Sequence, residues 1–346
     1  MSQMAVLQLI AGLLIASSSM QSSATGNFIF TSAPFASAHA SNIVQLQNGD
    51  FLASWFGGSA EGKPDVAIWA SRFSGGRWST PFEMVREPDI ACYNPVMFYT
   101  KDGRLWFYYK FGPHPSSWTA GRRWSDDDGR NWSQVEHLPA GLYGPIRAKP
   151  LVLEDGTIVS GTSVESYHSW ASWIERSTDN GKTWKRIGPI TVPRHAPDRV
   201  NSSGTTYGII QPSVVSLGGG KLRLYARSTP QIGRICIADS ADSGLTWTQA
   251  RPIAVPNPNS GIDAVRLEDG RIVLVYNNTT TGRTPLNLAV SEDTEHFRMF
   301  KTLEDQPGEY SYPAMIQGRE GDLHITYTWN RKRIRYIRIP LADIPR

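Results

Sequence analysis

SDDDGRNW, at residues 125–132, recurs in nearly the same form as STDNGKTW at 177–184 and SADSGLTW at 240–247. All three copies fit the pattern S-x-D-x-G-x-x-W. Two degenerate copies flank them: SRFSGGRW at 71–78 lacks the Asp, and SEDTEHF at 291–297 lacks the Gly and ends in Phe. A pattern that recurs about every 50 residues indicates an array of similar structural units.

A second repeat interleaves with the first and consists of an apolar segment, a tight Gly-containing turn and another apolar segment. The segments are short and rich in β-branched and aromatic residues, which favours strands. Asn-Gly, Asp-Gly and Gly-rich turns between them are typical of β-hairpins. The copies span residues 42–55, 94–109, 149–162, 211–226, 263–276 and 312–327.

Repeated units that are each too small to bury a face alone predict an all-β fold, namely a six-bladed β-propeller. The Ser and Asp of each box can hold a turn between outer strands by bonding backbone N–H groups, and the Gly supplies a position with positive φ. We therefore expect the boxes to be structural rather than catalytic. The DDDG of the first box also lacks the ligand spacing of an EF-hand.

The sixth unit has no box after its hairpin, only a basic run at 330–338. Charged and apolar residues alternate there, which predicts a half-buried edge strand with a solvated basic face. The segment NFIFTS at 27–32 can pair beside that strand and close the ring. Closure by an N-terminal strand implies a single domain over residues 25–346.

The first residues predict export. The apolar run AVLQLIAGLLIA at 5–16 is too short to span a bilayer, and the small residues Ser22, Ser23 and Ala24 follow it. This pattern favours a signal peptide at 1–24 and a secreted or periplasmic protein without a membrane span. The two cysteines, Cys92 and Cys236, do not make a disulfide framework.

Charge and motif content exclude several function classes. The net charge of +4 is spread along the chain, so no nucleic-acid partner is predicted. The seven histidines lack zinc-site spacing. The sequence contains no G-x-S-x-G, G-x-x-x-x-G-K-[ST], G-x-G-x-x-G or H-E-x-x-H motif. We expect a monomer without a metal or other cofactor.

Candidate site residues are the polar side chains at the ends of the hairpins, because a propeller gathers such positions at the mouth of its central channel. Those near hairpin starts are His39, Asn94, Lys149, Gln211, Asp263 and Tyr312, and those near hairpin ends or in the following loops are Glu61, Asp65, Lys110, Glu165, Arg227 and Arg283. Lys149, Arg227 and Arg283 would place three positive charges at the mouth of the channel. These charges favour binding of an anion, and an acidic sugar is a natural candidate.

The boxes and the six expected blades resemble the sialidase, or neuraminidase, superfamily. More narrowly, the chain resembles the bacterial predicted neuraminidases with BNR, or Asp-box, repeats. Three segments carry this resemblance: WFGGSAEGKPDVAIW at 55–69, PNPNSGIDAVRLEDGR at 256–271 and GEYSYPA at 308–314. The resemblance covers residues 28–338. It implies an exo-acting glycoside hydrolase that removes a terminal acidic sugar, sialic acid or a related one, from glycans.

The resemblance also implies roles for individual residues. The family's second and third arginines, which bind the sugar carboxylate, match Arg227 and Arg283. The family's nucleophile opens the sixth hairpin and matches Tyr312, whereas we expect Tyr310 to pack or to line the substrate.

The acid/base position, in the loop after the first hairpin, points to Glu61, with Asp65 as the second choice. This sequence departs from the family pattern twice. No arginine precedes the first hairpin, where His39 stands instead. The glutamate that assists the nucleophile is replaced by Gln211, which cannot accept a proton.

The resemblance implies a retaining hydrolysis in two steps, with Tyr312 as the attacking group. A neutral phenol approaches a carbon that carries a carboxylate without the repulsion that an anionic nucleophile would meet. Because a phenol needs a base to attack, Glu309 and Glu165 are the hypothetical replacements for the missing glutamate.

Two other functions stay open at this stage. His39, Tyr312 and the arginines could instead remove the proton next to a uronate carboxylate, as propeller polysaccharide lyases do. A glycan-binding propeller without catalysis is the third possibility. The sugar and its linkage are not specified by the sequence.

Overall fold

The computed structural model describes residues 25–166, 169–193 and 206–346. Within these ranges the chain is all-β, with 25 strands and two short 3-10 helices, η1 (Pro115–Ser117) and η2 (Leu341–Asp343). The predicted signal peptide lies outside them. Neither helix in the described ranges has the length and apolar character needed to cross a bilayer.

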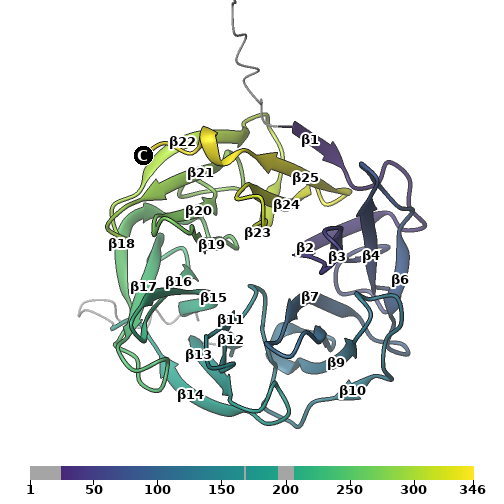
Figure 1. Ribbon diagram of the computed structural model, residues 1–346, viewed down its shortest axis with the longest axis horizontal. Coiled ribbons are helices and arrows are strands. Elements are labelled where there is room, and N and C mark those ends of the chain that lie inside the picture. Colours follow the sequence, from purple (N-terminus) through teal and green to yellow (C-terminus); the bar gives the residue numbers. More distant parts are fainter. Residues whose placement is uncertain (1–24, 167–168, 194–205) are drawn as a thin grey trace, which may run out of the picture.

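The strands form consecutive antiparallel groups that follow one another around a ring, with the first strand of each group near the centre (Figure 1). The first group contains β2 (Ser37–Gln45), β3 (Phe51–Gly58), β4 (Ala67–Ser74), β5 (Arg77–Trp78) and β6 (Phe82–Val85). The second contains β7 (Cys92–Tyr99), β8 (Leu105–Phe111), β9 (Thr119–Ser125) and β10 (Glu136–His137), and the third β11 (Leu151–Val152), β12 (Ile158–Glu165), β13 (Ser169–Ser177) and β14 (Lys185–Ile190).

Three further groups complete the described strands. They are β15 (Tyr207–Gly218), β16 (Lys221–Ser228), β17 (Arg234–Ser240) and β18 (Arg251–Pro256); then β19 (Asp263–Arg266), β20 (Ile272–Tyr276), β21 (Leu286–Ser291) and β22 (Arg298–Glu304); then β23 (Tyr310–Gln317), β24 (Leu323–Trp329) and β25 (Arg333–Ile339) with β1 (Thr25–Phe28). The third and fourth groups join in one eight-stranded sheet, because Ser169 and Trp170 pair in parallel with Tyr207 and Gly208.

All six predicted hairpins are present as antiparallel neighbours. They are β2–β3, β7–β8, β11–β12, β15–β16, β19–β20 and β23–β24. Buried apolar side chains fill the space between neighbouring groups, so each sheet is stabilised by the next one. The arrangement is consistent with the predicted propeller.

The Ser-Asp-Gly boxes hold the turn after the third strand of a group, as predicted. After β13, the buried Ser177 hydroxyl accepts a hydrogen bond from the Gly181 N–H at 2.9 Å, and Asp179 accepts one at 2.9 Å from the backbone N–H four residues on. Ser125 and Ser240 make the same serine–glycine bond at 2.9 Å. These bonds satisfy N–H groups that the turn leaves without strand partners.

Four of the central strands carry a bulge at the same place, where the register of the hairpin shifts. The first residue of each bulge has a positive φ: +55° at Ala40, +40° at Asn94, +55° at Gln211 and +51° at Tyr312. Residues other than glycine rarely adopt this conformation, and a bulge re-aims the side chain that it carries. The bulges thereby bring Gln211 and Tyr312 together near the centre of the ring.

The N-terminal segment pairs with the basic strand, as predicted. β1 runs antiparallel along β25, and the Ile29 N–H continues the ladder to the Ile334 carbonyl at 2.9 Å. The expectation that residues 330–338 form an edge strand is wrong, because β1 covers β25 and makes it an internal strand of its sheet. Arg331 lies in the turn that precedes β25, outside the strand.

Replacing Ser177 by alanine tests the structural role of the boxes. Ser177→Ala leaves the buried Gly181 N–H without an acceptor, so the free energy of unfolding should fall by about 1–3 kcal/mol. Urea unfolding followed by tryptophan fluorescence measures the change. The exposed Ser74 is the matched control, and Ser74→Ala should change stability by less than about 0.5 kcal/mol. Equal effects of the two substitutions would contradict the role given to the box.

Candidate active site

The phenol of Tyr312 lies at the centre of a polar cluster. Its oxygen accepts an N–H from Arg227 Nη1 at 2.6 Å and another from Gln211 Nε2 at 3.2 Å. The Oε1 of Gln211 accepts from the same Arg227 nitrogen at 3.2 Å, so the amide turns its N–H toward the phenol. Two N–H donors on one phenol oxygen stabilise negative charge there.

Three guanidinium groups surround the ring of Tyr312. The Cζ atoms of Arg147, Arg227 and Arg283 lie 5.3, 5.7 and 5.5 Å from the ring centroid. The buried Arg147, which the sequence analysis did not single out, donates to the carbonyl of Pro313, and its Nε and Nη1 have no hydrogen-bond partner within the described ranges. Burial lowers the pKa of Arg147 from its usual value. The ring therefore lies in a strongly cationic environment.

His39 packs against the same ring, with the two ring centroids 4.3 Å apart. Its Nδ1 is hydrogen-bonded to the Thr328 hydroxyl at 2.9 Å. Burial holds the pKa of His39 well below its usual value, and nearby positive charges lower it further, namely those of Arg331, Arg283, Arg147 and Arg227. The imidazole is therefore neutral at neutral pH.

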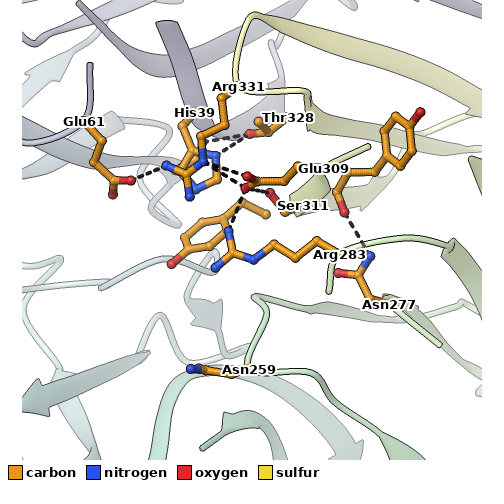
Figure 2. Close-up of polar contacts among 12 residues, drawn as sticks. His39, Glu61, Asn259, Asn277, Arg283, Glu309, Ser311, Thr328 and Arg331 are labelled. Carbon is orange, nitrogen blue, oxygen red and sulfur yellow. Dashed lines mark hydrogen bonds and ion pairs between the residues drawn. The ribbon is translucent and has the colours of Figure 1, made fainter. Parts of the chain in front are cut away.

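Arg331 is a site residue that the sequence analysis missed. Figure 2 shows its guanidinium between two carboxylates: Nε donates to the Glu309 oxygens at 2.9 and 3.0 Å, and Nη1 donates to Glu61. Asn330 and Arg331 form the tight turn between β24 and β25, with φ of +51° and +52°. The one available signal was Asn330, because asparagine favours turns that require positive φ.

Glu309 is held by arginines and is not placed to act as a base for Tyr312. Arg283 Nη1 donates to it at 2.8 Å, alongside Arg331 and the Ser311 hydroxyl at 3.0 Å. Burial pushes the pKa of Glu309 upward, but the hydrogen bond and charge of Arg331 outweigh burial and leave the pKa below its usual value. Within the described ranges, no hydrogen bond joins Glu309 to the phenol.

Tyr310 packs in the apolar core, which is the first of the two alternatives that the sequence left open for it. It is buried in the apolar cluster between the last two groups of strands. Its backbone N–H donates to the Arg283 carbonyl at 2.9 Å, and its carbonyl accepts from Asn277 Nδ2 at 2.9 Å. Tyr310 thus fixes the backbone that carries Arg283.

Glu165, at the end of β12, lies near both Arg227 and Glu61. Burial raises the pKa of Glu165 above its usual value; the positive charge of Arg227 opposes this shift and the negative charge of Glu61 adds to it. Glu61 and Glu165 are therefore close enough for their charges to interact, and Glu165 also lies within the field of Arg227.

Lys149 and Asp263 bind each other instead of joining the Tyr312 cluster. The Lys149 Nζ lies 3.1 Å from the Asp263 carboxylate. Asp263 also accepts from the Ser213 hydroxyl at 2.7 Å and from the Met315 N–H at 2.9 Å. This pair ties three central strands together, β15, β19 and β23.

Two other candidates have local structural contacts. Asp65 accepts from the Ser59 N–H at 2.7 Å and from its hydroxyl at 2.8 Å, and these bonds lower the pKa of Asp65. Asn94 is buried at the bulge of β7 and donates to the Ile146 carbonyl at 3.2 Å. Neither residue contacts the phenol of Tyr312.

Within the described residues, no group of three or more His, Cys, Asp or Glu side chains could hold a metal ion. Cys92 and Cys236 are buried free thiols.

Comparison with known proteins identifies the family. The model of the BNR repeat-like domain matches residues 49–325. A sialidase of Micromonospora viridifaciens is 28% identical over 176 residues, which cover 50% of this chain and 26% of that protein. A sialidase of Bacteroides fragilis (strain YCH46) is 24% identical over 245 residues, which cover 64% of this chain and 41% of that protein. This chain thus spans about a quarter of one relative and about two fifths of the other.

Solved structures share the fold. A protein of unknown function from Dyadobacter fermentans DSM 18053 superposes with a TM-score of 0.74 at 17% identity, over 91% of this chain and 98% of its own. The NanB sialidase from Streptococcus pneumoniae superposes with a TM-score of 0.73 at 14% identity, over 92% and 71%. At these identities the likeness concerns the fold alone. The chain belongs to the BNR repeat-like domain family, within the sialidase superfamily.

Proposed function

We propose that this protein is a six-bladed β-propeller glycoside hydrolase of the sialidase type. It removes a terminal acidic sugar from a glycan, sialic acid or a related one, by a retaining mechanism with Tyr312 as nucleophile. The observation that carries the proposal is the phenol oxygen of Tyr312, bound by Arg227 and Gln211 and surrounded by cations. The apolar run at residues 5–16 supports export, so the enzyme acts outside the cytoplasm.

The charges of the site support an acidic substrate. Arg227 donates its Nε to Asn259 at 2.7 Å and has no carboxylate partner within the described ranges, so it is available to bind a substrate carboxylate. Arg283 lies on the other side of the same phenol. Arg331 supplies a third guanidinium close to His39, where the sequence lacks the expected arginine. Arg283 and Arg331 already share the Glu309 carboxylate, so an incoming carboxylate would chiefly balance the charge of Arg227 through bidentate hydrogen bonds.

The contacts of Gln211 suggest how the phenol reacts without a carboxylate base. Negative charge develops on the Tyr312 oxygen as its proton passes to solvent, and the N–H groups of Arg227 and Gln211 stabilise that charge. The phenolate attacks the anomeric carbon while an acid protonates the departing oxygen. In the second step water attacks the same carbon and the phenolate leaves, which retains the anomeric configuration.

A lyase acting on a uronate-containing glycan is the second candidate. The observation that favours it is the neutral His39 in contact with Tyr312, because an uncharged imidazole can accept a proton from a carbon next to a neutralised carboxylate. The two reactions differ in their products. A lyase yields an unsaturated sugar that absorbs ultraviolet light, whereas hydrolysis yields a saturated sugar.

Tyr312→Phe tests the nucleophile. Removing the hydroxyl removes the attacking atom, so kcat should fall by about 100-fold or more with little change in KM, which corresponds to roughly 3 kcal/mol of barrier. The assay measures sugar release from aryl glycosides of sialic acid, other nonulosonic acids and uronic acids. Tyr310→Phe, two residues away and buried, is the matched control and should keep activity. Full activity of Tyr312→Phe would overturn the assignment.

Arg331→Gln tests the third cation. If Arg331 binds the substrate carboxylate, KM should rise by about tenfold or more for the acidic sugar. The methyl ester of the same substrate lacks the negative charge, so its KM should change less. The exposed neighbour Lys332 is the charge-matched control, and Lys332→Gln should leave both KM values unchanged. Equal KM changes for acid and ester would argue against carboxylate binding by Arg331.

A further inference from the structure

Glu165 and the residue that contacts Gln211 lie on the same face of β12, in the third group of strands. Residues at alternate positions of a strand share a face. On this face the Ser163 hydroxyl accepts from the Gln211 N–H at 3.3 Å, and the Ser172 hydroxyl donates to the Ile209 carbonyl at 3.3 Å. Glu165 is two residues beyond Ser163, so it lies on the face that packs against β15, at the end of its strand.

The pairing of β12 with β13 places Glu165 beside Arg227. Glu165 lies directly opposite Trp170, and opposite residues of an antiparallel pair have adjacent side chains on one face. The ring of Trp170 lies 5.5 Å from the Cζ of Arg227, which binds the Tyr312 oxygen. Within the described residues Glu165 makes no hydrogen bond or ion pair. Its carboxyl is therefore available to a substrate held at Tyr312.

The two carboxyl groups of the site differ in a way that separates their roles. Glu61 is bound by Arg331, and its side chain is 43% exposed. Glu165 is more enclosed, and burial raises its pKa despite the opposing charge of Arg227. A pair of carboxyl groups whose environments differ in this way is the usual arrangement when one of them must deliver a proton at neutral pH.

We infer that Glu165, and not Glu61, is the general acid and base of the reaction, an inference that rests on the proposed function. In the first step the Glu165 carboxyl gives its proton to the glycosidic oxygen as the bond from that oxygen to the anomeric carbon breaks and the bond to the Tyr312 oxygen forms. In the second step the carboxylate takes a proton from the attacking water, and the phenolate that leaves regains a proton from solvent. Glu61 is a positioning residue that orients Arg331.

Leaving-group dependence tests this assignment. Glu165→Gln and the matched control Glu61→Gln are compared on two glycosides of an acidic sugar that the wild-type enzyme hydrolyses. The 4-nitrophenyl glycoside needs little protonation to leave, whereas the alkyl glycoside needs a full proton. Glu165→Gln should lower kcat/KM by about 100-fold or more on the alkyl glycoside and by less than about tenfold on the nitrophenyl glycoside. Retained activity on the nitrophenyl glycoside also shows that the variant is folded.

The pH profile gives a second readout. An acid must be protonated to act, so wild-type kcat/KM on the alkyl glycoside should fall as pH rises through the raised pKa of Glu165. Glu165→Gln should lose this alkaline limb, and Glu61→Gln should keep it. Equal losses on both glycosides for Glu165→Gln, or selective loss for Glu61→Gln, would overturn the assignment. A wild-type enzyme that hydrolyses neither glycoside would instead overturn the proposed function itself.

Discussion

A single nitrogen, Nη1 of Arg227, joins the two side chains that the strand bulges bring to the centre of the ring. It donates to the phenol oxygen of Tyr312 and to the amide oxygen of Gln211. This contact requires both bulges, because a side chain on a regular strand points to a face of its sheet. The positive φ at both positions is therefore a structural cost that the site retains. The same contact forces Gln211 to act as an N–H donor toward the phenol.

Local signals were sufficient to predict most of the fold. The hairpins depend on turns of a few residues, and the boxes depend on contacts within five residues, so both are visible in one sequence. The bulges were missed, although Pro95, Pro212 and Pro313 each follow a bulge residue. A proline inside an otherwise central strand is a known sign of a bulge, because it cannot donate to the strand ladder.

The candidate site was only partly predictable, because its contacts join distant parts of the chain. Arg331 and Glu61 are 270 positions apart, and a basic run gave no sign that one arginine leaves the strand to bind carboxylates. Lys149 and Asp263 were both singled out as candidates from the sequence, but only the fold reveals that they bind each other. Tyr312 and Arg227, by contrast, were found because each marks one end of a recognisable hairpin.

Detection of a covalent sugar on Tyr312 during turnover is the most direct test of the nucleophilic mechanism. The enzyme is mixed with an aryl glycoside of an acidic sugar, quenched in acid during turnover, and digested with trypsin. Peptide 302–319 contains both Tyr310 and Tyr312. If Tyr312 is the nucleophile, this peptide gains the mass of one sugar residue, and fragment ions place the sugar on Tyr312. Turnover with an unmodified peptide, or a sugar on Tyr310, would contradict this mechanism.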